Sequence, residues 1–191
     1  RQRQMCIRDR IMDNIPKIEF SYVLDMGTGT GILAIYLSKM AKRVLATDIN
    51  PYALRCAQEN LKLNGIENVE VRMSDLFSNI KPDEKFDLII FNPPYLPRGE
   101  DDHLVKPEVS KSWVGGDKGC EVIDRFLKDA WKHLMDRGVI EFLFSSLTEG
   151  IWDVLKRHEK MYEFRFLKKR RFLFEEIYLY KASLKGRSSK V

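Results

Sequence analysis

The sequence has few cysteines and histidines and no long apolar run. Its three cysteines, Cys6, Cys56 and Cys120, are scattered without a CxxC pair, and its three histidines are equally dispersed. This spacing predicts neither a disulfide framework nor a structural metal site, and it is typical of a reduced, cytoplasmic protein. A membrane span needs about 18 consecutive apolar residues. No stretch approaches that length and none resembles a secretory signal, so we expect no association with a membrane.

The net charge of +5 is concentrated at the two ends of the chain. Residues 1–10 carry +3 and residues 161–191 carry +6, which leaves −4 for residues 11–160. Basicity confined to the ends is poor support for a nucleic-acid-binding body. Residues 1–10 (RQRQMCIRDR) show no apolar periodicity, and MCIRDR resembles a translated transposase-adapter sequence. We interpret them as a non-native segment, with a disordered basic arm as the alternative.

Strand-like and helix-like patterns alternate from residue 22 onward. Strands are predicted for 22–26, 43–48, 68–75, 86–91 and 138–145, and two more around a basic turn within 162–182. Helices are predicted for 32–40, 51–65, 120–135 and 148–159, with 92–117 irregular. Strands that alternate with helices build a parallel sheet covered on both faces. We predict a single, N-terminally truncated α/β domain over 11–191: a doubly wound, mostly parallel, seven-stranded Rossmann-like sheet with a C-terminal antiparallel hairpin.

A glycine-rich loop, DMGTGTG (25–31), follows the first predicted strand and opens the first helix. Glycine lets the backbone approach a ligand where a Cβ would clash. No Lys-Ser/Thr pair follows, which excludes a P-loop, and the glycines are spaced G-x-G-x-G rather than as in the dinucleotide fingerprint. Asp48 ends the second strand, where a carboxylate can accept hydrogen bonds from both ribose hydroxyls. The pattern predicts a nucleoside site, with a packing turn as the alternative.

The third strand ends in SDLF (74–77), where the following loop would cross the same crevice. Asp75 could meet the exocyclic amine of adenine while Leu76 packs on its ring, but an Asx turn explains the aspartate equally well. Ligands of α/β sheets bind outside the carboxyl ends of the strands. From Tyr22 onward the sequence resembles the class I S-adenosylmethionine-dependent methyltransferases.

This resemblance implies a set of cofactor contacts. The glycine loop would hold the methionine part of S-adenosylmethionine, the end of the second strand its ribose, and the end of the third strand its adenine. The cofactor-binding residues implied are Asp25, Gly27, Thr28, Gly29, Thr30, Gly31, Asp48, Ile49, Asp75, Leu76 and Asn92.

NPPY (92–95) stands directly after the apolar fourth strand, FDLIIF. An amide or aryl amine is a poor nucleophile, because its nitrogen lone pair is delocalised. Hydrogen bonds from a substrate NH2 to Asn92 Oδ1 and the rigid Pro93 carbonyl would aim that lone pair at a methyl donor, and Tyr95 would stack on the planar group. We interpret Asn92, Pro93 and Tyr95 as catalytic and all four residues, Pro94 included, as substrate-binding. Simple chain punctuation is the alternative.

The motif leaves the acceptor open between a protein glutamine and an exocyclic nucleobase amine, adenine N6 or guanine N2. A duplex-DNA enzyme extrudes its base and usually needs further recognition structure, for which this chain has little spare length. KSWVGGDKGCEVIDRFL (111–127), with its W-x-G-G-x-x-G pattern, resembles the archaeal and eukaryotic branch of the HemK-type release-factor glutamine methyltransferases. That family's acceptor is the glutamine of the Gly-Gly-Gln loop of a class 1 release factor, and the product is N5-methylglutamine.

The same resemblance implies a small zinc-binding activator subunit, for which 68–75 is a candidate strand-pairing edge. It also implies a helical segment before the glycine loop, which 11–20 (IMDNIPKIEF) does not match. KKRR (168–171) is predicted to be a solvated turn rather than a contact for RNA or an acidic substrate. The three histidines are predicted to lie at the surface and the phenylalanines of the last two strands in the core. A cofactor-fold protein that binds without turnover is a further alternative.

Overall fold

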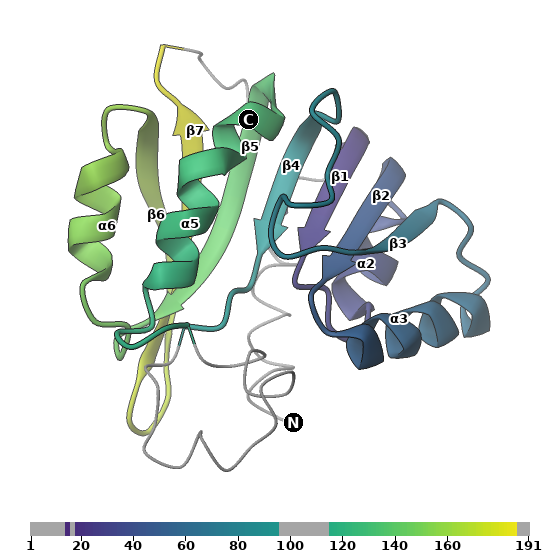
Figure 1. Ribbon diagram of the computed structural model, residues 1–191, viewed down its shortest axis with the longest axis horizontal. Coiled ribbons are helices and arrows are strands. Elements are labelled where there is room, and N and C mark those ends of the chain that lie inside the picture. The colour runs from purple at the N-terminus through teal and green to yellow at the C-terminus, as the bar shows by residue number, and fades with distance from the viewer. Residues whose placement is uncertain (1–13, 16–17, 96–114, 187–191) are drawn as a thin grey trace.

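The computed structural model describes residues 14–15, 18–95 and 115–186, and these form a seven-stranded sheet (Figure 1). The strand order is β3-β2-β1-β4-β5-β7-β6. The strands are Phe20–Met26 (β1), Ala41–Asp48 (β2), Val69–Met73 (β3), Phe86–Phe91 (β4), Leu134–Ser145 (β5), Tyr162–Arg171 (β6) and Glu176–Leu184 (β7). β1 to β5 are parallel, and β7 pairs antiparallel with β5 and β6. The predicted fold class is confirmed, while the segment 1–10 lies outside the described residues.

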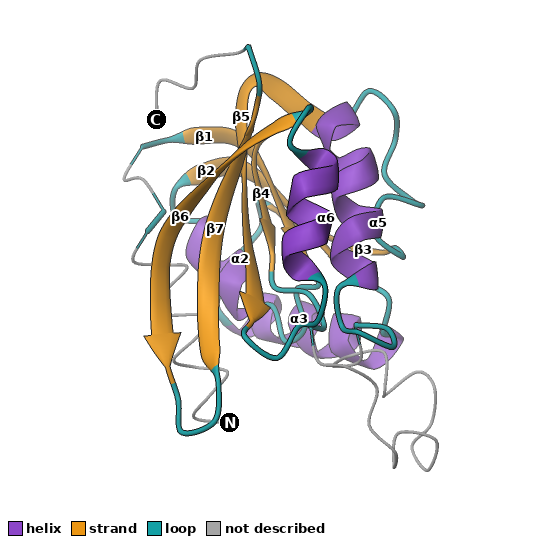
Figure 2. Ribbon diagram, turned by 90° about the vertical axis from the view of Figure 1, so that its left-hand side faces the viewer, coloured by secondary structure: helices purple, strands orange, loops and turns teal. Residues whose placement is uncertain are grey.

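Helices cover both faces of this sheet (Figure 2). They are α2 (Ile32–Leu37), α3 (Pro51–Leu63), α5 (Glu121–Ala130) and α6 (Ile151–His158). Buried side chains of α5 and α6 share a core cluster with Leu24 and Ile89, whereas those of α2 share a second cluster with Val23 and Ile90. Because neighbouring residues of a strand point to opposite faces, a strand buried on both sides is apolar throughout. This explains the continuous apolar runs of β1 and β4.

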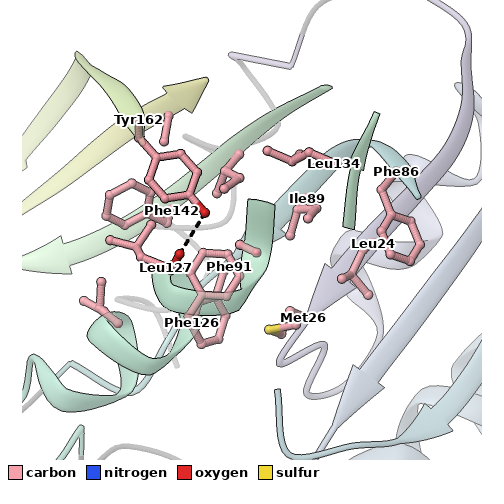
Figure 3. Packing of buried hydrophobic residues seen from close by; sticks show 14 of the residues in the cluster. Leu24, Met26, Phe86, Ile89, Phe91, Phe126, Leu127, Leu134, Phe142 and Tyr162 are labelled. Carbon is pink, nitrogen blue, oxygen red and sulfur yellow. Dashed lines mark hydrogen bonds between the residues drawn. The ribbon is translucent and has the colours of Figure 1, made fainter. Parts of the chain in front are cut away.

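The larger core cluster lies between the sheet and α5 (Figure 3). Phe91 at the end of β4 tilts against Phe126 of α5, with 4.6 Å between the ring centroids. Tyr162 at the start of β6 is 1% exposed, and its hydroxyl donates to the Leu127 carbonyl over 2.8 Å. This bond satisfies the polar end of a buried ring. The cluster therefore holds the end of β4 against α5.

Several element boundaries differ from the sequence predictions by a few residues, and two differences are the clearest. The helix predicted over 120–135 ends at Ala130, and after the 3-10 turn Trp131–His133 the strand β5 already begins at Leu134. KKRR (168–171) belongs to β6, so the turn that joins the last two strands is 172–175. Pairing with β7 overrides the low strand propensity of a basic run, because cross-strand contacts decide which residues a strand accepts.

Two predictions of burial are wrong. His133 is 6% exposed: its ring stacks on Phe77 with 4.9 Å between centroids, and its Nδ1 lies 3.0 Å from the Glu84 carbonyl oxygen. Phe166 and Phe174, predicted for the core, are 48% and 89% exposed. Phe166 lies on β6, the outermost strand of the described sheet, where alternation does not reveal which residues are buried. Phe174 lies beyond β6, in the turn 172–175.

Glu141 is a buried carboxyl in the middle of β5. It is 3% exposed, its Oε2 has no hydrogen-bond partner among the described residues, and its register partner on β7 is Lys181. Burial raises the pKa of this carboxyl from 4.5 to about 7. The folded protein therefore holds the proton more tightly than the unfolded chain does. The resulting contribution to stability is complete below pH 4.5 and is lost as the pH rises toward 7.

We expect Glu141→Gln to unfold at higher urea concentration than the parent chain at pH 8, by an amount worth at most about 3 kcal/mol. The substitution removes the cost of ionising a buried group, and near pH 5 the two proteins should differ little. Urea unfolding at both pH values measures this, with Glu163→Gln, at an exposed position of β6, as the matched control. Identical pH dependence of the parent chain and the Glu141 variant would contradict it.

Candidate active site

The carboxyl ends of β1, β2 and β4 lie side by side. Met26 at the end of β1 is the register partner of Thr47 in β2 and of Phe91 in β4. The glycine loop, the carboxylate that ends β2 and the NPPY segment therefore start from one edge of the sheet, as predicted. A methyl group placed on Gly27 would lie 3.7 Å from the Asn92 carbonyl oxygen, so the loop and NPPY are immediate neighbours.

The glycine loop turns sharply between β1 and α2. Positive φ angles of 69°, 57° and 79° are found at Gly27, Gly29 and Gly31, in the left-handed region that favours glycine. The Thr28 N–H donates to the Thr47 carbonyl over 2.9 Å, which ties the loop to β2. A methyl group on Gly31 would stand 3.0 Å from the Ala57 Cβ, so this glycine also lets α3 approach. The loop is therefore fixed by backbone geometry rather than by side chains alone.

Two carboxylates brace the loop. Asp48 accepts the Gly29 N–H at Oδ2 and the Asn50 N–H at Oδ1, both over 2.9 Å. Asp25 is 2% exposed and accepts the Thr28 hydroxyl over 2.6 Å. A carboxylate offers about four lone-pair sites. Asp48 is thus positioned by backbone N–H groups and still has acceptor capacity for a ligand.

Asp75 and Leu76 follow β3, as predicted. The Asp75 carboxylate lies 3.0 Å from an Arg125 guanidinium nitrogen of α5, in an ion pair that is partly exposed to solvent. Leu76 has a φ of 50° and packs against the larger core cluster. Together with Arg125 they line an open hollow of about 460 Å³. The aspartate is therefore part of an ion pair that the sequence did not predict, and its role toward adenine stays a prediction.

NPPY follows β4 directly, and the structure describes the surroundings of each of its four residues. The Oδ1 atom of Asn92 is buried and has no hydrogen-bond partner among the described residues. Pro93 is buried and Pro94 half-buried. Tyr95 packs in part against the smaller core cluster, and its carbonyl accepts the Thr148 hydroxyl over 2.8 Å. An unpaired buried amide oxygen costs about 1–3 kcal/mol, so Asn92 Oδ1 is a candidate acceptor for an N–H of a ligand.

Gly115 lies directly against the NPPY segment. A methyl group on Gly115 would stand 2.5 Å from the Pro94 carbonyl oxygen and 2.4 Å from that of Gly119. Both neighbours are backbone atoms, so this position admits only glycine without a shift of the chain. Gly116 and Gly119 have φ angles of 112° and 84°. Gly115 of W-x-G-G-x-x-G thus contacts Pro94, besides belonging to the loop that precedes α5, while Trp113 lies outside the described residues.

The remaining predicted cofactor residues, Thr30 and Ile49, are half-buried in the turns after β1 and β2. The Thr30 carbonyl accepts from Asn60 Nδ2 over 2.8 Å. The sequence did not predict the contact of Thr148 with Tyr95. These residues are 53 positions apart, and a threonine in a loop carries no signal that it will support a distant motif.

Two other titratable side chains, His158 and Cys120, belong to α6 and to the residue before α5. His158 Nε2 lies 2.9 Å from Asp124 Oδ1, on the α5–α6 side. His103 lies outside the described residues. Burial raises the pKa of the Cys120 thiol. Within the described ranges, no group of three or more His, Cys, Asp or Glu side chains could hold a metal ion, and no helix is long and apolar enough to cross a membrane.

A doubly wound sheet with this strand order, and a glycine loop beside an acidic strand end at its carboxyl edge, defines a Rossmann-like methyltransferase. The E. cuniculi Mtq2–Trm112 complex, described as responsible for methylation of the eRF1 translation termination factor, superposes with a TM-score of 0.68 and 28% identity. The alignment covers 95% of this chain and 94% of that chain. Residues 9–111 match the methyltransferase small domain family, and the chain belongs to this family.

Three relatives by sequence are named as methyltransferases that act on proteins. A protein of Methanocaldococcus jannaschii, named provisionally as a protein N5-glutamine methyltransferase, is 41% identical over 139 residues, which are 72% of this chain and 68% of that protein. The release factor glutamine methyltransferase of Koribacter versatilis is 40% identical over 122 residues, 61% of this chain and 43% of that protein. A ribosomal protein L11 methyltransferase of Caldicellulosiruptor bescii is 51% identical over 140 residues, 72% and 36% respectively. The chain spans about two thirds of the first relative and less than half of the other two.

Proposed function

We propose that this protein transfers a methyl group from S-adenosylmethionine to the side-chain amide nitrogen (N5) of a glutamine. The acceptor is the glutamine of the Gly-Gly-Gln loop of a class 1 translation release factor. The observation that carries this proposal is the Oδ1 of Asn92, which is buried and has no hydrogen-bond partner among the described residues. The backbone carbonyl of Asn92 lies beside Gly27 of the glycine loop, and two successive prolines follow it. The glutamine methyltransferase names of two relatives, and the eRF1 methylation ascribed to the Mtq2–Trm112 complex, support a glutamine as acceptor.

The residues at the carboxyl edge suit this cofactor. The positive-φ glycines let backbone approach a ligand without a Cβ between them, and Asp48 has lone pairs left for ribose hydroxyls. When bound, the cofactor supplies an electrophilic methyl group on a sulfonium. We assign residues 25–31 to its methionine part, Asp48 and Ile49 to its ribose, and Asp75 and Leu76 to its adenine.

In this proposal Asn92 Oδ1 and the Pro93 carbonyl accept the two N–H bonds of the substrate amide. The pair orients the nitrogen so that its lone pair faces the methyl donor. Proline makes the backbone acceptor rigid, so little reorganisation accompanies the reaction. Tyr95 presents its ring to the planar amide. The nitrogen becomes acidic as it gains a carbon and releases its proton to water or to these acceptors, so no histidine is required.

Asp48→Ala should weaken S-adenosylmethionine binding at least tenfold, because it removes a charged acceptor and also frees the Gly29 N–H that shapes the loop. Isothermal titration calorimetry with the cofactor measures this. Asp83→Ala, at an exposed position before β4, is the matched control and should bind as the parent chain does. Unchanged affinity of the Asp48 variant would refute the ribose assignment.

The proposed function is tested by methyl transfer from labelled cofactor to a panel of acceptors. The panel contains a class 1 release factor, the same factor with Gly-Gly-Ala in place of Gly-Gly-Gln, ribosomal protein L11, bulk tRNA and ribosomal RNA. We expect label only in the Gly-Gly-Gln factor. Label in RNA would instead support the exocyclic-amine alternative, and label in L11 would support a different protein acceptor.

We further propose a small activator subunit at the free edge of β3, the outermost strand on its side of the sheet. The Mtq2–Trm112 complex supports a partner of this kind. We also propose that the activator subunit of this protein binds zinc. An edge strand offers unpaired backbone groups for strand addition. Co-elution of the chain with a candidate subunit in size-exclusion chromatography tests this, and separate elution would refute it.

A further inference from the structure

The turn between β6 and β7, residues 172–175, carries the two most exposed large apolar side chains of the described structure. Leu173 is 92% exposed and Phe174 is 89% exposed. The Phe172 N–H donates to the Glu175 carbonyl over 2.7 Å and closes the turn. Tight hairpin turns favour Gly, Asn, Asp and Ser for their backbone conformations. Turn chemistry therefore does not explain a Leu-Phe pair here, and projecting apolar side chains of this kind mark interaction sites.

This turn lies at the same edge of the sheet as NPPY (Figures 1 and 2). Ser145, the last residue of β5, is the register partner of Ile177 near the start of β7. The Ser145 hydroxyl donates to a Glu175 carboxylate oxygen over 2.8 Å, and the Ser145 N–H donates to the Thr148 hydroxyl over 3.2 Å. The Thr148 hydroxyl in turn donates to the Tyr95 carbonyl over 2.8 Å. Three hydrogen bonds thus connect the turn with the end of NPPY.

Exposed aromatic side chains continue from the turn along the neighbouring elements. Trp152 at the start of α6 is 58% exposed, and Phe166 on β6 is 48% exposed. Both contact Tyr180 of β7, with 6.2 Å and 5.7 Å between ring centroids. We define the hairpin surface as Trp152, Phe166, Leu173 and Phe174. Aromatic residues in such a patch are the usual anchors of protein interfaces.

We propose that the hairpin surface docks the polypeptide that carries the acceptor glutamine. This inference rests on the proposed function and deepens it. Lys168 and Arg171, at the end of β6, would form a charged rim, so the docked polypeptide should present an apolar patch bordered by carboxylates. Docking beside the NPPY edge would present a distant loop of the same polypeptide to Asn92.

Two observations favour a polypeptide over RNA at this surface. Lys169 is already paired with Glu176 at 3.1 Å, and the Arg170 guanidinium lies 5.5 Å from the Phe172 ring centroid. The basic run is therefore partly engaged within the hairpin.

The test compares the parent chain with the double variant Leu173→Ser, Phe174→Ser on two acceptors: an intact class 1 release factor and a short peptide that contains its Gly-Gly-Gln loop. We expect the variant to raise KM for the intact factor about tenfold with kcat unchanged. Kinetics with the peptide should not change, because the peptide is too short to reach the turn. Leu63→Ser, at an equally exposed leucine that ends α3, is the matched control and should behave as the parent chain.

Each outcome decides the inference. Equal KM values of the double variant and the parent chain for the intact factor would overturn docking at the hairpin surface while leaving the proposed function in place. Equal losses with the intact factor and the peptide would also overturn it, since the effect would then lie in the site itself. Salt-sensitive tRNA binding by the parent chain that the variant loses would assign the surface to RNA instead. A parent chain that methylates neither acceptor would overturn the proposed function, and this inference with it.

Discussion

Asn92→Ala should reduce turnover about 100-fold or more while leaving the affinity for S-adenosylmethionine nearly unchanged. Loss of one oriented contact made in the transition state has an effect of this size. The change removes the acceptor that holds one N–H of the substrate amide, and the backbone of the glycine loop and Asp48 stays in place. Methyl transfer to the release factor under cofactor saturation measures kcat, and calorimetry measures the cofactor affinity.

The controls for this prediction separate chemistry from folding. Asn92 Oδ1 has no partner among the described residues, so its removal should not lower thermal stability. Asn64→Ala, at the exposed end of α3, changes the same side chain at the opposite edge of the sheet and should leave turnover unchanged. Near-parental kcat in the Asn92 variant would rule out the proposed role of the carboxamide.

Gly115→Ala should also reduce turnover, by about 100-fold, although residue 115 donates no group to the reaction. The added Cβ would stand 2.5 Å from the Pro94 carbonyl oxygen and 2.4 Å from the Gly119 carbonyl oxygen. Neither backbone atom can move without its neighbours, so the NPPY segment must shift. A misplacement of roughly 1 Å at a reacting group costs about 100-fold in rate. Single-turnover kinetics with saturating cofactor measure the effect on the chemical step.

Gly65→Ala provides the matched control for this second prediction. Gly65 follows α3, and a methyl group placed there has no atom within 4 Å. Its positive φ of 63° makes the substitution destabilising by about 1 kcal/mol, so it reproduces a loss of stability without contact with NPPY. If both glycine variants retained parental turnover, Gly115 would have no positioning role.

Much of the fold was predictable because its determinants are local. β4 was predicted to the residue as 86–91, since a short apolar run bounded by a charged loop and by prolines defines a buried strand. Asn50 and Pro51 mark the start of α3 as an N-cap and a first-turn proline. The boundary between α5 and β5 was missed, because the amphipathic pattern continues beyond Ala130 although the helix does not.

The positions of the candidate site residues were predictable because they, too, follow from local sequence. The glycine loop, Asp48 and NPPY each occupy the end of a strand, and parallel strands bring their carboxyl ends to one edge. Burial of His133 was not predictable, because it depends on Phe77 and Glu84, which approach from a loop about fifty residues away. The exposure of Phe174 was likewise hidden, since a strand-like sequence pattern does not show where a hairpin turns.

Local sequence is enough to specify which segments become strands and helices, which strand ends carry polar groups, and that NPPY must leave the sheet. These features follow from periodicity, turn chemistry and the missing N–H of proline, all of which act over a few neighbouring residues. Three further features depend on the folded arrangement: Gly115 lies against Pro94, Thr148 bonds to the Tyr95 carbonyl, and Leu173 and Phe174 project beside the same edge. Such contacts join distant segments, and their geometry exists only once the sheet has assembled.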